Sequence, residues 1–287
     1  MHRFKNKCLG FHPGFHPGFH PGFLCYFTLL LSSTCQAAFD FIGVGAEPLA
    51  LGNAMVAYRY GAYAVYYNPA NITAERKPLI ELGYRSFYGL SSPNQTSVLL
   101  QYPVRSVPLA ICCINLGDRI YREMHLALGS SCTYQEKLSL GISLNLYYLN
   151  IASYSTALST GINLGFAYPL SDRFTMGVLI TNVNQPKFSI INEKLPQVFV
   201  LGWCYNLQQK IIFCCDLFRD VKYEQDYRAG VLLKLKGALT LRFGLEDKSN
   251  TCTMGLGLTF KSLKFDYTAM LHNTLGLSLA TSIQLAL

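Results

Sequence analysis

Residues 138–146 read LSLGISLNL, in which every even-numbered residue is aliphatic and every odd-numbered residue is small or polar. This period of two places alternate side chains on opposite faces of an extended chain, so the stretch predicts a β-strand with one apolar and one polar face. Residues 251–260, TCTMGLGLTF, repeat the pattern. Further copies occur at 158–168, 174–180, 229–235, 263–271 and 275–287.

Fourteen candidate strands follow residue 78, each nine to fifteen residues long. Globular strands average about five or six residues, whereas tilted membrane strands need about nine to eleven. The fold class that follows is all-β, a transmembrane antiparallel β-barrel of about 14 strands. The candidates cover residues 79–88, 95–103, 107–116, 121–134, 137–151, 158–168, 173–182, 196–206, 209–218, 226–235, 238–246, 251–260, 262–271 and 275–287.

The composition supports a membrane barrel over a soluble protein. The chain is 51% hydrophobic and only 14% charged, against about 25% charged in typical soluble domains. From residue 40 onward it has no run of 18 apolar residues, so a helical membrane span is not expected. The basic residues are scattered and form no cluster of the kind that binds nucleic acid.

The connections and the aromatic residues fit the same architecture. The even-numbered connections are short, and several odd-numbered ones are longer, such as 89–94 and 182–195. Bacterial barrels have short turns on the periplasmic side, longer loops outside and aromatic girdles at both interfaces. The aromatic residues expected near strand ends are Tyr84, Phe87, Tyr88, Tyr102, Tyr121, Tyr134, Tyr147, Tyr148, Tyr168, Phe174, Tyr205, Phe260 and Tyr267.

Residues 1–37 have the layout of a secretory signal peptide, with a basic start, an apolar run from Phe23 to Leu31 and small residues at Cys35 and Ala37. Cleavage is expected after Ala37 or Ala38, and the location that follows is the bacterial outer membrane. Removing this segment leaves 21 basic and 16 acidic residues, a net charge of +5.

Two alternatives concern this amino-terminal segment. Three FHPG repeats over 11–22 carry His12, His16 and His20, but Pro and Gly in each repeat make a metal site there a poor expectation. Cys35 raises the alternative of a lipoprotein, although the preceding Ser32, Ser33 and Thr34 fit an acylation site poorly.

Residues 41–72, FIGVGAEPLALGNAMVAYRYGAYAVYYNPANI, are the part of the exported chain that does not read as a strand. A mostly apolar run from Ala46 to Tyr58 predicts a short helix, and Asn68-Pro69-Ala70 predicts a turn. We expect this segment to fill the barrel lumen. The domain boundaries that follow are a signal peptide at 1–37, a plug at 38–76 and a barrel at 77–287.

The sequence offers little chemistry for catalysis. After residue 37 only His125 and His272 remain, and neither has partners at metal-ligand spacing, so we expect no enzyme activity, no metal and no cofactor. His125 falls on the polar face of its strand, which predicts a solvated lumen or loop histidine.

The exported chain has seven cysteines and no CxxC motif. A hairpin turn at 207–208 would place Cys204 opposite residue 211, which predicts no disulfide across that hairpin. The abundance of free thiols indicates a reducing niche. Disulfides formed through the plug are an alternative. The seven are Cys112, Cys113, Cys132, Cys204, Cys214, Cys215 and Cys252.

The stretch GAEPLALGNAMVAYRYGAYAVYYNPANI resembles the opening of the FadL-like outer-membrane barrels, within them the PorV/PorQ and UPF0164 branches. Asn71 and the region of Tyr60 depart from the family pattern. The resemblance implies a 14-stranded barrel with an amino-terminal hatch in its lumen. The plug or gating residues it implies are Gly45, Leu49, Leu51, Gly52, Asn53, Asn68, Pro69 and Ala70.

Two functions follow from this resemblance. The first is a transporter or channel for hydrophobic compounds such as long-chain fatty acids, with outer-membrane lipids and a hydrophobic small molecule as partners. The second is a non-transporting component of type IX protein secretion or surface attachment, whose partners would be secretion-machinery or cargo proteins. A lipid hydrolase embedded in the barrel is a third alternative. The lumen is expected to carry little charge, from Ser139, Gly141, Ser143, Asn145, Thr253, Gly255 and Gly257.

Overall fold

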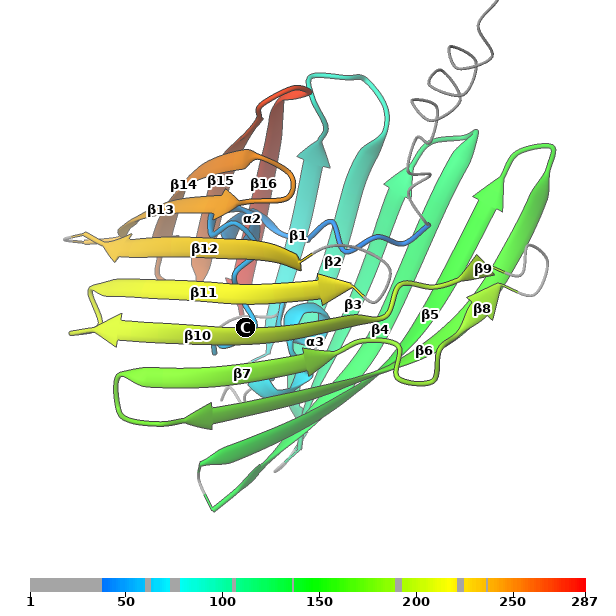
Figure 1. Ribbon diagram of the computed structural model, residues 1–287. Coiled ribbons are helices and arrows are strands. Elements are labelled where there is room, and N and C mark those ends of the chain that lie inside the picture. The colour runs from blue at the N-terminus through cyan, green and yellow to red at the C-terminus, as the bar shows by residue number, and fades with distance from the viewer. Residues whose placement is uncertain are drawn as a thin grey trace, which may run out of the picture. The chain divides into compact units, whose positions relative to one another are not determined.

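Within the residues that the computed structural model describes, fourteen strands close into one antiparallel barrel (Figure 1). The described residues are 38–59, 63–72, 78–104, 107–135, 137–188, 193–220, 225–235 and 237–287. The barrel strands are β1 (Leu79–Ser86), β2 (Asn94–Val104), β3 (Val107–Gly117), β4 (Tyr121–Tyr134), β5 (Leu138–Ile151), β6 (Ser155–Pro169), β7 (Phe174–Ile180), β10 (Val198–Leu207), β11 (Ile211–Asp220), β12 (Gln225–Lys234), β13 (Leu239–Glu246), β14 (Thr251–Phe260), β15 (Leu263–His272) and β16 (Gly276–Ala286).

The topology is a meander in which each strand pairs with its neighbours in the chain, and β1 pairs with β16 to close the barrel. All fourteen predicted strands are confirmed, with ends that differ from the expected ones by at most three residues. A short hairpin of β8 (Lys187–Phe188) and β9 (Glu193–Lys194) lies between β7 and β10 and was not predicted. The predicted signal peptide, the FHPG repeats and Cys35 lie outside the described residues.

The barrel has two distinct ends. We call the end that holds the start of β1 and the end of β16 the turn end, because two to four residues join the strands there. The opposite end, the loop end, holds the two longest connections, residues 87–93 and 181–197. The predicted alternation is therefore confirmed for the longest loops, although several loop-end connections are only three or four residues long.

The register of the β10–β11 hairpin corrects one expectation. The turn consists of residues 208–210, because Leu207 pairs with Ile211. Cys204 therefore lies directly opposite Cys214 and not opposite residue 211. The prediction that Cys204 faces residue 211 across this hairpin is wrong.

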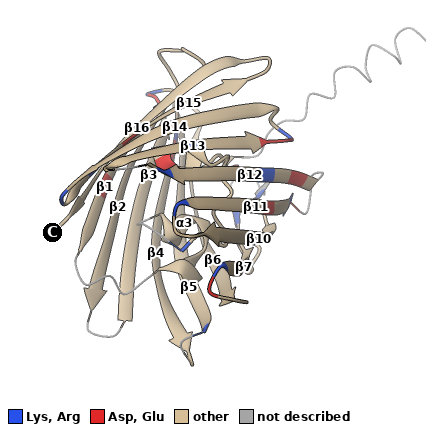
Figure 2. Ribbon diagram, turned by 90° about the vertical axis from the view of Figure 1, so that its left-hand side faces the viewer, with Lys and Arg blue, Asp and Glu red and all other residues tan. Residues whose placement is uncertain are grey.

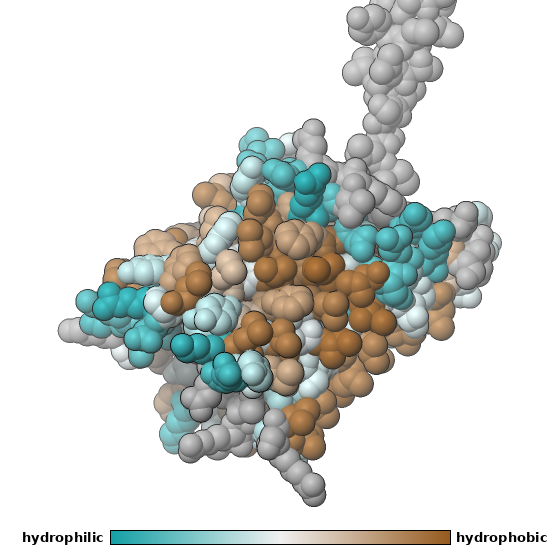
Figure 3. Space-filling model, turned by 60° about the horizontal axis from the view of Figure 1, so that its bottom comes forward, coloured by the Kyte–Doolittle hydropathy of each residue, from teal (hydrophilic) through white to brown (hydrophobic). Residues whose placement is uncertain are grey.

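The outer face of the barrel is apolar. Outward-facing aliphatic side chains such as Leu82, Leu144 and Leu256 are 38–56% exposed. Figure 3 shows one view in which hydrophobic residues form a wide surface, with hydrophilic residues gathered at its edges. Exposed aromatic residues near the turn end are Tyr102, Tyr134, Tyr168, Tyr205, Phe213, Phe260 and Phe265, and near the loop end Tyr84, Tyr121, Phe199 and Tyr227.

Two of the aromatic residues expected in the girdles are exceptions. Tyr147 is 6% exposed and Phe87 is 7% exposed, and both are buried within the molecule. Position near a strand end does not decide which face a side chain takes, because a shift of one residue reverses it.

The segment before β1 fills the lumen. It contains helix α2 (Ala46–Ala50), helix α3 (Ala64–Tyr67) and the 3₁₀ turn η1 (Pro69–Asn71), and most of its described side chains are buried. We call residues 38–59 and 63–72 the plug. The expected helix over Ala46–Tyr58 is wrong beyond Ala50, because Gly52 and Asn53 adopt positive φ and break it. None of the described helices is long and apolar enough to cross a membrane.

The plug contacts all fourteen barrel strands. Close approach requires glycine in the wall, because plug atoms occupy the space that a Cβ would take. At Gly244 that space holds Gly52 N, and at Gly230 it holds Leu51 O. The wall glycines with this property include Gly141, Gly165, Gly177, Gly230, Gly244 and Gly255.

Candidate functional site

A buried cluster of charges joins the plug to the wall. We call Glu47 of α2, Arg242 of β13, and Lys264 and Asp266 of β15 the anchor cluster. The guanidinium of Arg242 donates to Glu47 Oε1 at 3.0 Å and to Asp266 Oδ1 at 2.8 Å. The Lys264 ammonium also donates to Glu47 Oε2 and lies 3.3 Å from Asp266 Oδ2.

The expectation of a lumen with little charge is wrong. It holds for β5 and β14, from which it was drawn, but charged side chains point inward from β1, β11, β12, β13 and β15. Figure 2 shows charged residues along β11 and β12. The buried charged residues are Glu47 of the plug and Glu81, Arg85, Asp216, Asp220, Asp226, Arg228, Arg242 and Asp266 of the wall.

The pKa of Glu47 sets the pH range over which this carboxyl is charged. Burial raises the pKa of this carboxyl, but the charges of Arg242 and Lys264 outweigh burial and lower it from 4.5 to about 2. A carboxyl with a lowered pKa stabilises the folded state above its unfolded pKa, and this contribution is lost as the pH falls to the folded value. The plug should therefore stay docked down to pH 4.5 and loosen between pH 4.5 and about 2.

Conductance of the protein in planar bilayers across a pH series tests this expectation. The closed state should persist until the acid range, and Glu47→Gln should remove the component of the acid transition that comes from this carboxyl. Opening of the wild-type protein at neutral pH would contradict the assignment.

Backbone and amide contacts also hold the plug, against β11 and β13. Asp216 Oδ2 of β11 accepts from Met55 N at 2.9 Å and from Val56 N at 3.0 Å. Asn53 Nδ2 donates to Glu246 Oε1 at 2.6 Å. The hydroxyl of Tyr67 in α3 donates to Asn53 Oδ1 at 2.6 Å, so two parts of the plug are joined to each other.

The predicted turn at Asn68 connects the plug to the β5–β6 side of the wall. Asn68 Oδ1 accepts from Ala70 N at 3.0 Å and so caps η1. Its amide Nδ2 donates to Val56 O at 2.7 Å and to Phe166 O at 3.1 Å. Pro69, the first residue of η1, packs against Gly141. The side chain of Asn68 therefore forms hydrogen bonds with the turn, with another part of the plug and with the barrel wall.

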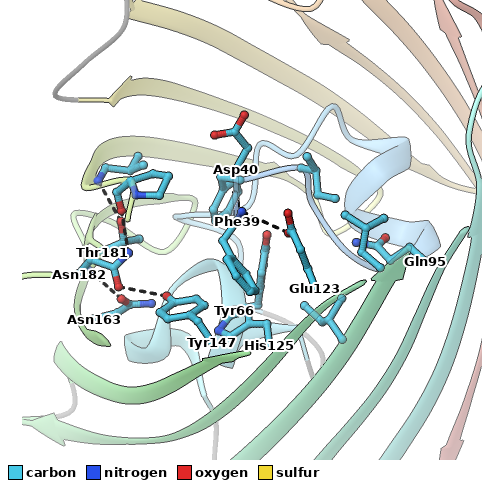
Figure 4. Close-up of a pocket in the computed structure, with 16 residues that line it drawn as sticks. Phe39, Asp40, Tyr66, Gln95, Glu123, His125, Tyr147, Asn163, Thr181 and Asn182 are labelled. Carbon is cyan, nitrogen blue, oxygen red and sulfur yellow. Dashed lines mark hydrogen bonds between the residues drawn. The ribbon is translucent and has the colours of Figure 1, made fainter. Parts of the chain in front are cut away.

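A cavity of about 60 Å³ lies between the plug and the wall toward the loop end (Figure 4). The amino-terminal end of the plug forms one side of it, and six strands and the 181–197 connection form the rest. The lining residues are Phe39, Asp40, Phe41, Ile42, Tyr66, Gln95, Ile114, Leu116, Glu123, His125, Tyr147, Asn163, Thr181, Asn182, Pro196 and Val198.

Aromatic rings dominate one part of this cavity. The ring of Phe39 packs edge-on against Tyr147, with ring centroids 5.1 Å apart. Its centroid also lies 5.7 Å from that of Phe188. The His125 ring stacks on Tyr147, with ring centroids 4.7 Å apart. The centroid of the Tyr66 ring lies 5.8 Å from that of His125. The Phe39 N–H donates to Glu123 Oε2 at 3.2 Å. The plug therefore places a phenyl ring of its own in an aromatic site.

Several polar groups of the cavity bond to one another. The Tyr147 hydroxyl donates to Asn182 Oδ1 at 3.1 Å, and Asn182 N donates to Asn163 Oδ1 at 2.9 Å. His125 Nε2 lies 2.9 Å from Asn145 Oδ1. Because these groups already have partners, the cavity offers a ligand mainly ring faces and aliphatic surface.

Solved structures with a similar fold include monoaromatic hydrocarbon channels, toluene transporters and a FadL homologue. The Ralstonia pickettii toluene transporter TbuX matches with a TM-score of 0.68 over 87% of this chain and 100% of its own, at 12% identity. The Pseudomonas putida toluene transporter TodX matches with a TM-score of 0.64 over 88% and 98%, at 14% identity. A Pseudomonas aeruginosa FadL homologue matches with a TM-score of 0.55 over 82% and 95%, at 11% identity. The chain has a FadL-like fold. No protein-family model and no curated protein matches the sequence.

In this FadL-like barrel the eight predicted plug residues do not form one site. Gly45, Leu49, Leu51, Gly52 and Asn53 lie on the side of β1 and β12–β16. Asn68, Pro69 and Ala70 lie against β5 and β6. None of the eight lines the cavity, so their role in gating stays a prediction.

Sequence reasoning missed the cavity residues Phe39, Tyr66 and Glu123, and it treated His125 only as a solvated residue. His125 does point into the lumen, but it is partly buried between Tyr66 and Tyr147. Inward alternation could have identified His125 and Tyr147 as neighbours across β4 and β5, where they pair directly. In the described part of the chain, no group of three or more His, Cys, Asp or Glu side chains is placed to hold a metal ion.

Proposed function

We propose that this protein transports hydrophobic compounds across the bacterial outer membrane. The observation that carries the proposal is the aromatic cavity at the loop end, which Phe39 of the plug partly fills. The FadL-like barrel supports it, because the similar structures named above include two toluene transporters. The apolar outer face, with aromatic residues near both ends, supports the membrane location.

The charges of the cavity favour uncharged substrates. Asp40 and Glu123 are among its lining residues, whereas Lys and Arg are absent from the lining that the structure describes. A fatty-acid carboxylate would meet negative potential and no cationic partner there. We therefore propose small uncharged hydrophobic compounds, such as monoaromatic hydrocarbons, as better substrates than long-chain fatty acids.

Uptake by intact cells with and without the gene tests both statements. Cells that carry the gene should take up labelled toluene faster, and labelled fatty acid should show a smaller gain. Equal toluene uptake with and without the gene would refute the proposed transport. A larger gain for the fatty acid would refute the substrate preference and leave transport intact.

Phe39→Ala should increase uptake. Removing the ring enlarges the cavity from about 60 Å³ toward the roughly 150 Å³ at which an apolar cavity binds benzene. A substrate then no longer has to displace the ring from Tyr147 and Phe188. Initial rates of toluene uptake at matched expression give the comparison.

Leu90→Ala is a matched control, because this exposed loop residue lies outside the cavity. Its uptake should equal that of the wild type. Unchanged uptake in Phe39→Ala would show that the ring does not limit passage.

A non-transporting role in protein secretion or surface attachment remains the second proposal. The contact of the plug with all fourteen strands, together with its buried ion pairs, favours a barrel that stays closed. Affinity purification from native membranes distinguishes the two functions. This second function would be supported by recovery of secretion-machinery or cargo proteins, together with equal toluene uptake by cells with and without the gene.

A further inference from the structure

We propose that Cys204 and Cys214 form a disulfide through exchange with a small anionic disulfide that enters from the turn end of the barrel. The two residues face each other across the β10–β11 hairpin, and their Sγ atoms lie 2.9 Å apart as free thiols. A disulfide bond is about 2.05 Å long, so the sulfur atoms need to approach by only about 0.9 Å. This inference is independent of the proposed transport.

The surroundings separate this pair from the other cysteines. Cys204 is 8% exposed and Cys214 is 4% exposed, and both pack in the core that contains Tyr58 of the plug. Cys215, the next residue, points to the lipid side and is exposed. The disulfide would therefore join β10 and β11 on the lumen face, where the two cysteines pack in the same core as Tyr58 of the plug.

Access comes through a second cavity, of about 460 Å³, at the turn end. Cys204 lines it and Cys214 does not. Its lining includes Lys137 and residues of the 170–173 turn, and the basic side chains of Arg59, Lys137 and Arg173 outnumber the single acidic one, Asp172. This positive potential favours an anionic reagent. Glutathione disulfide has the required charge and chemistry.

The exchange proceeds in two balanced steps. The Cys204 thiolate attacks one sulfur of the glutathione disulfide, forming a mixed disulfide and releasing one glutathione thiolate. The Cys214 thiolate then attacks the Cys204 sulfur and releases the second glutathione. Two cysteine thiols are oxidised, one glutathione disulfide is reduced to two glutathiones, and the thiol protons pass to the released thiolates. The proposed outer-membrane location places the turn end in the periplasm, where disulfides persist.

Peptide mapping after treatment with glutathione disulfide tests the proposal. The folded protein, in detergent and free of reductant, is treated, alkylated, denatured and digested with trypsin. Cleavage after Lys194, Lys210 and Arg219 puts Cys204 in peptide 195–210 and Cys214 in peptide 211–219. The expected product is these two peptides linked by a bond that a reductant breaks. Absence of the linked peptides from folded protein would overturn the proposal.

Three variants show which cysteine reacts with glutathione disulfide and which one completes the disulfide. Cys215→Ser should still give the linked peptides, since Cys215 faces the lipid. Cys214→Ser should give no link and should accumulate one glutathionyl group on peptide 195–210, because the resolving thiol is missing. Cys204→Ser should give neither product. A link that survives in Cys214→Ser and disappears in Cys215→Ser would overturn the assignment, and heat-modifiable gel migration establishes that each variant is folded.

Discussion

Replacing Arg242 with methionine is expected to destabilise the docked plug by about 3–5 kcal/mol, which is typical for removing one partner of a buried ion pair. Arg242 is 2% exposed and bridges Glu47 of the plug and Asp266 of β15. Without it two buried carboxylates share Lys264 alone. Hydrogen exchange of residues 38–59 should become faster, while exchange in the barrel strands should change little.

Two further variants show whether this effect comes from charge. Arg219→Met removes an exposed arginine from β11 and should change stability by no more than about 0.5 kcal/mol. Adding Glu47→Gln to Arg242→Met leaves Asp266 and Lys264 as a balanced ion pair and should restore much of the protection. If exchange in the plug is the same in Arg242→Met and wild type, the anchor cluster does not hold the plug.

Gly244→Val is expected to displace the plug from the lumen and open the barrel. A Cβ at position 244 would collide with Gly52 N and would lie 2.5 Å from Leu51 C, both of which are plug backbone atoms. Overpacking of this kind typically costs about 1–3 kcal/mol, and backbone cannot rotate away as a side chain can. Valine favours extended structure, so β13 itself should still form. Conductance in planar bilayers should rise toward that of a barrel from which residues 38–72 are deleted.

Leu245→Val is the matched control for this substitution. Leu245 is the next residue in β13, but it points outward and is 57% exposed. This variant should keep the low conductance of the wild type. A closed Gly244→Val barrel would show that the plug adapts to the added methyl groups and that close packing does not require glycine at this position.

The strands were predictable because two independent signals coincide in them. The alternation in residues such as 138–146 fixes the direction of each side chain, and lengths of nine or more residues distinguish membrane strands from globular ones. The hairpin at β8 and β9 was missed because strands of two residues show no period.

The buried charges were missed because the expectation was drawn from β5 and β14, whose sequences contain no charged residue. Arg242 lies in LTLRFGLE and Asp266 in LKFDYTAMLH, and in both strands the charge falls on the lumen face. A charge in a lipid-facing strand is costly on its outer face, so these positions themselves predict inward charges. Which charges pair could not be predicted, since Glu47 reaches Arg242 only through the path of the plug.

The cavity also depends on the path that the plug takes through the lumen. Its walls come from strands up to a hundred residues apart in sequence, together with Phe39 at the described start of the plug. The motif residues from Gly45 to Ala70 identified the plug, because their small size and turn chemistry are local properties. The position of Phe39 against Tyr147 is a tertiary property, and no local pattern encodes it.

The proposed binding of hydrophobic compounds in the cavity can be tested by a crystal structure of the protein soaked with bromobenzene, whose bromine atom gives an anomalous signal. We expect a bromine peak in the cavity between Tyr66 and Tyr147, with the ring of Phe39 moved out of the place it now occupies. Bromine bound only on the outer face of the barrel, with Phe39 still packed on Tyr147, would contradict a cavity that receives hydrophobic compounds.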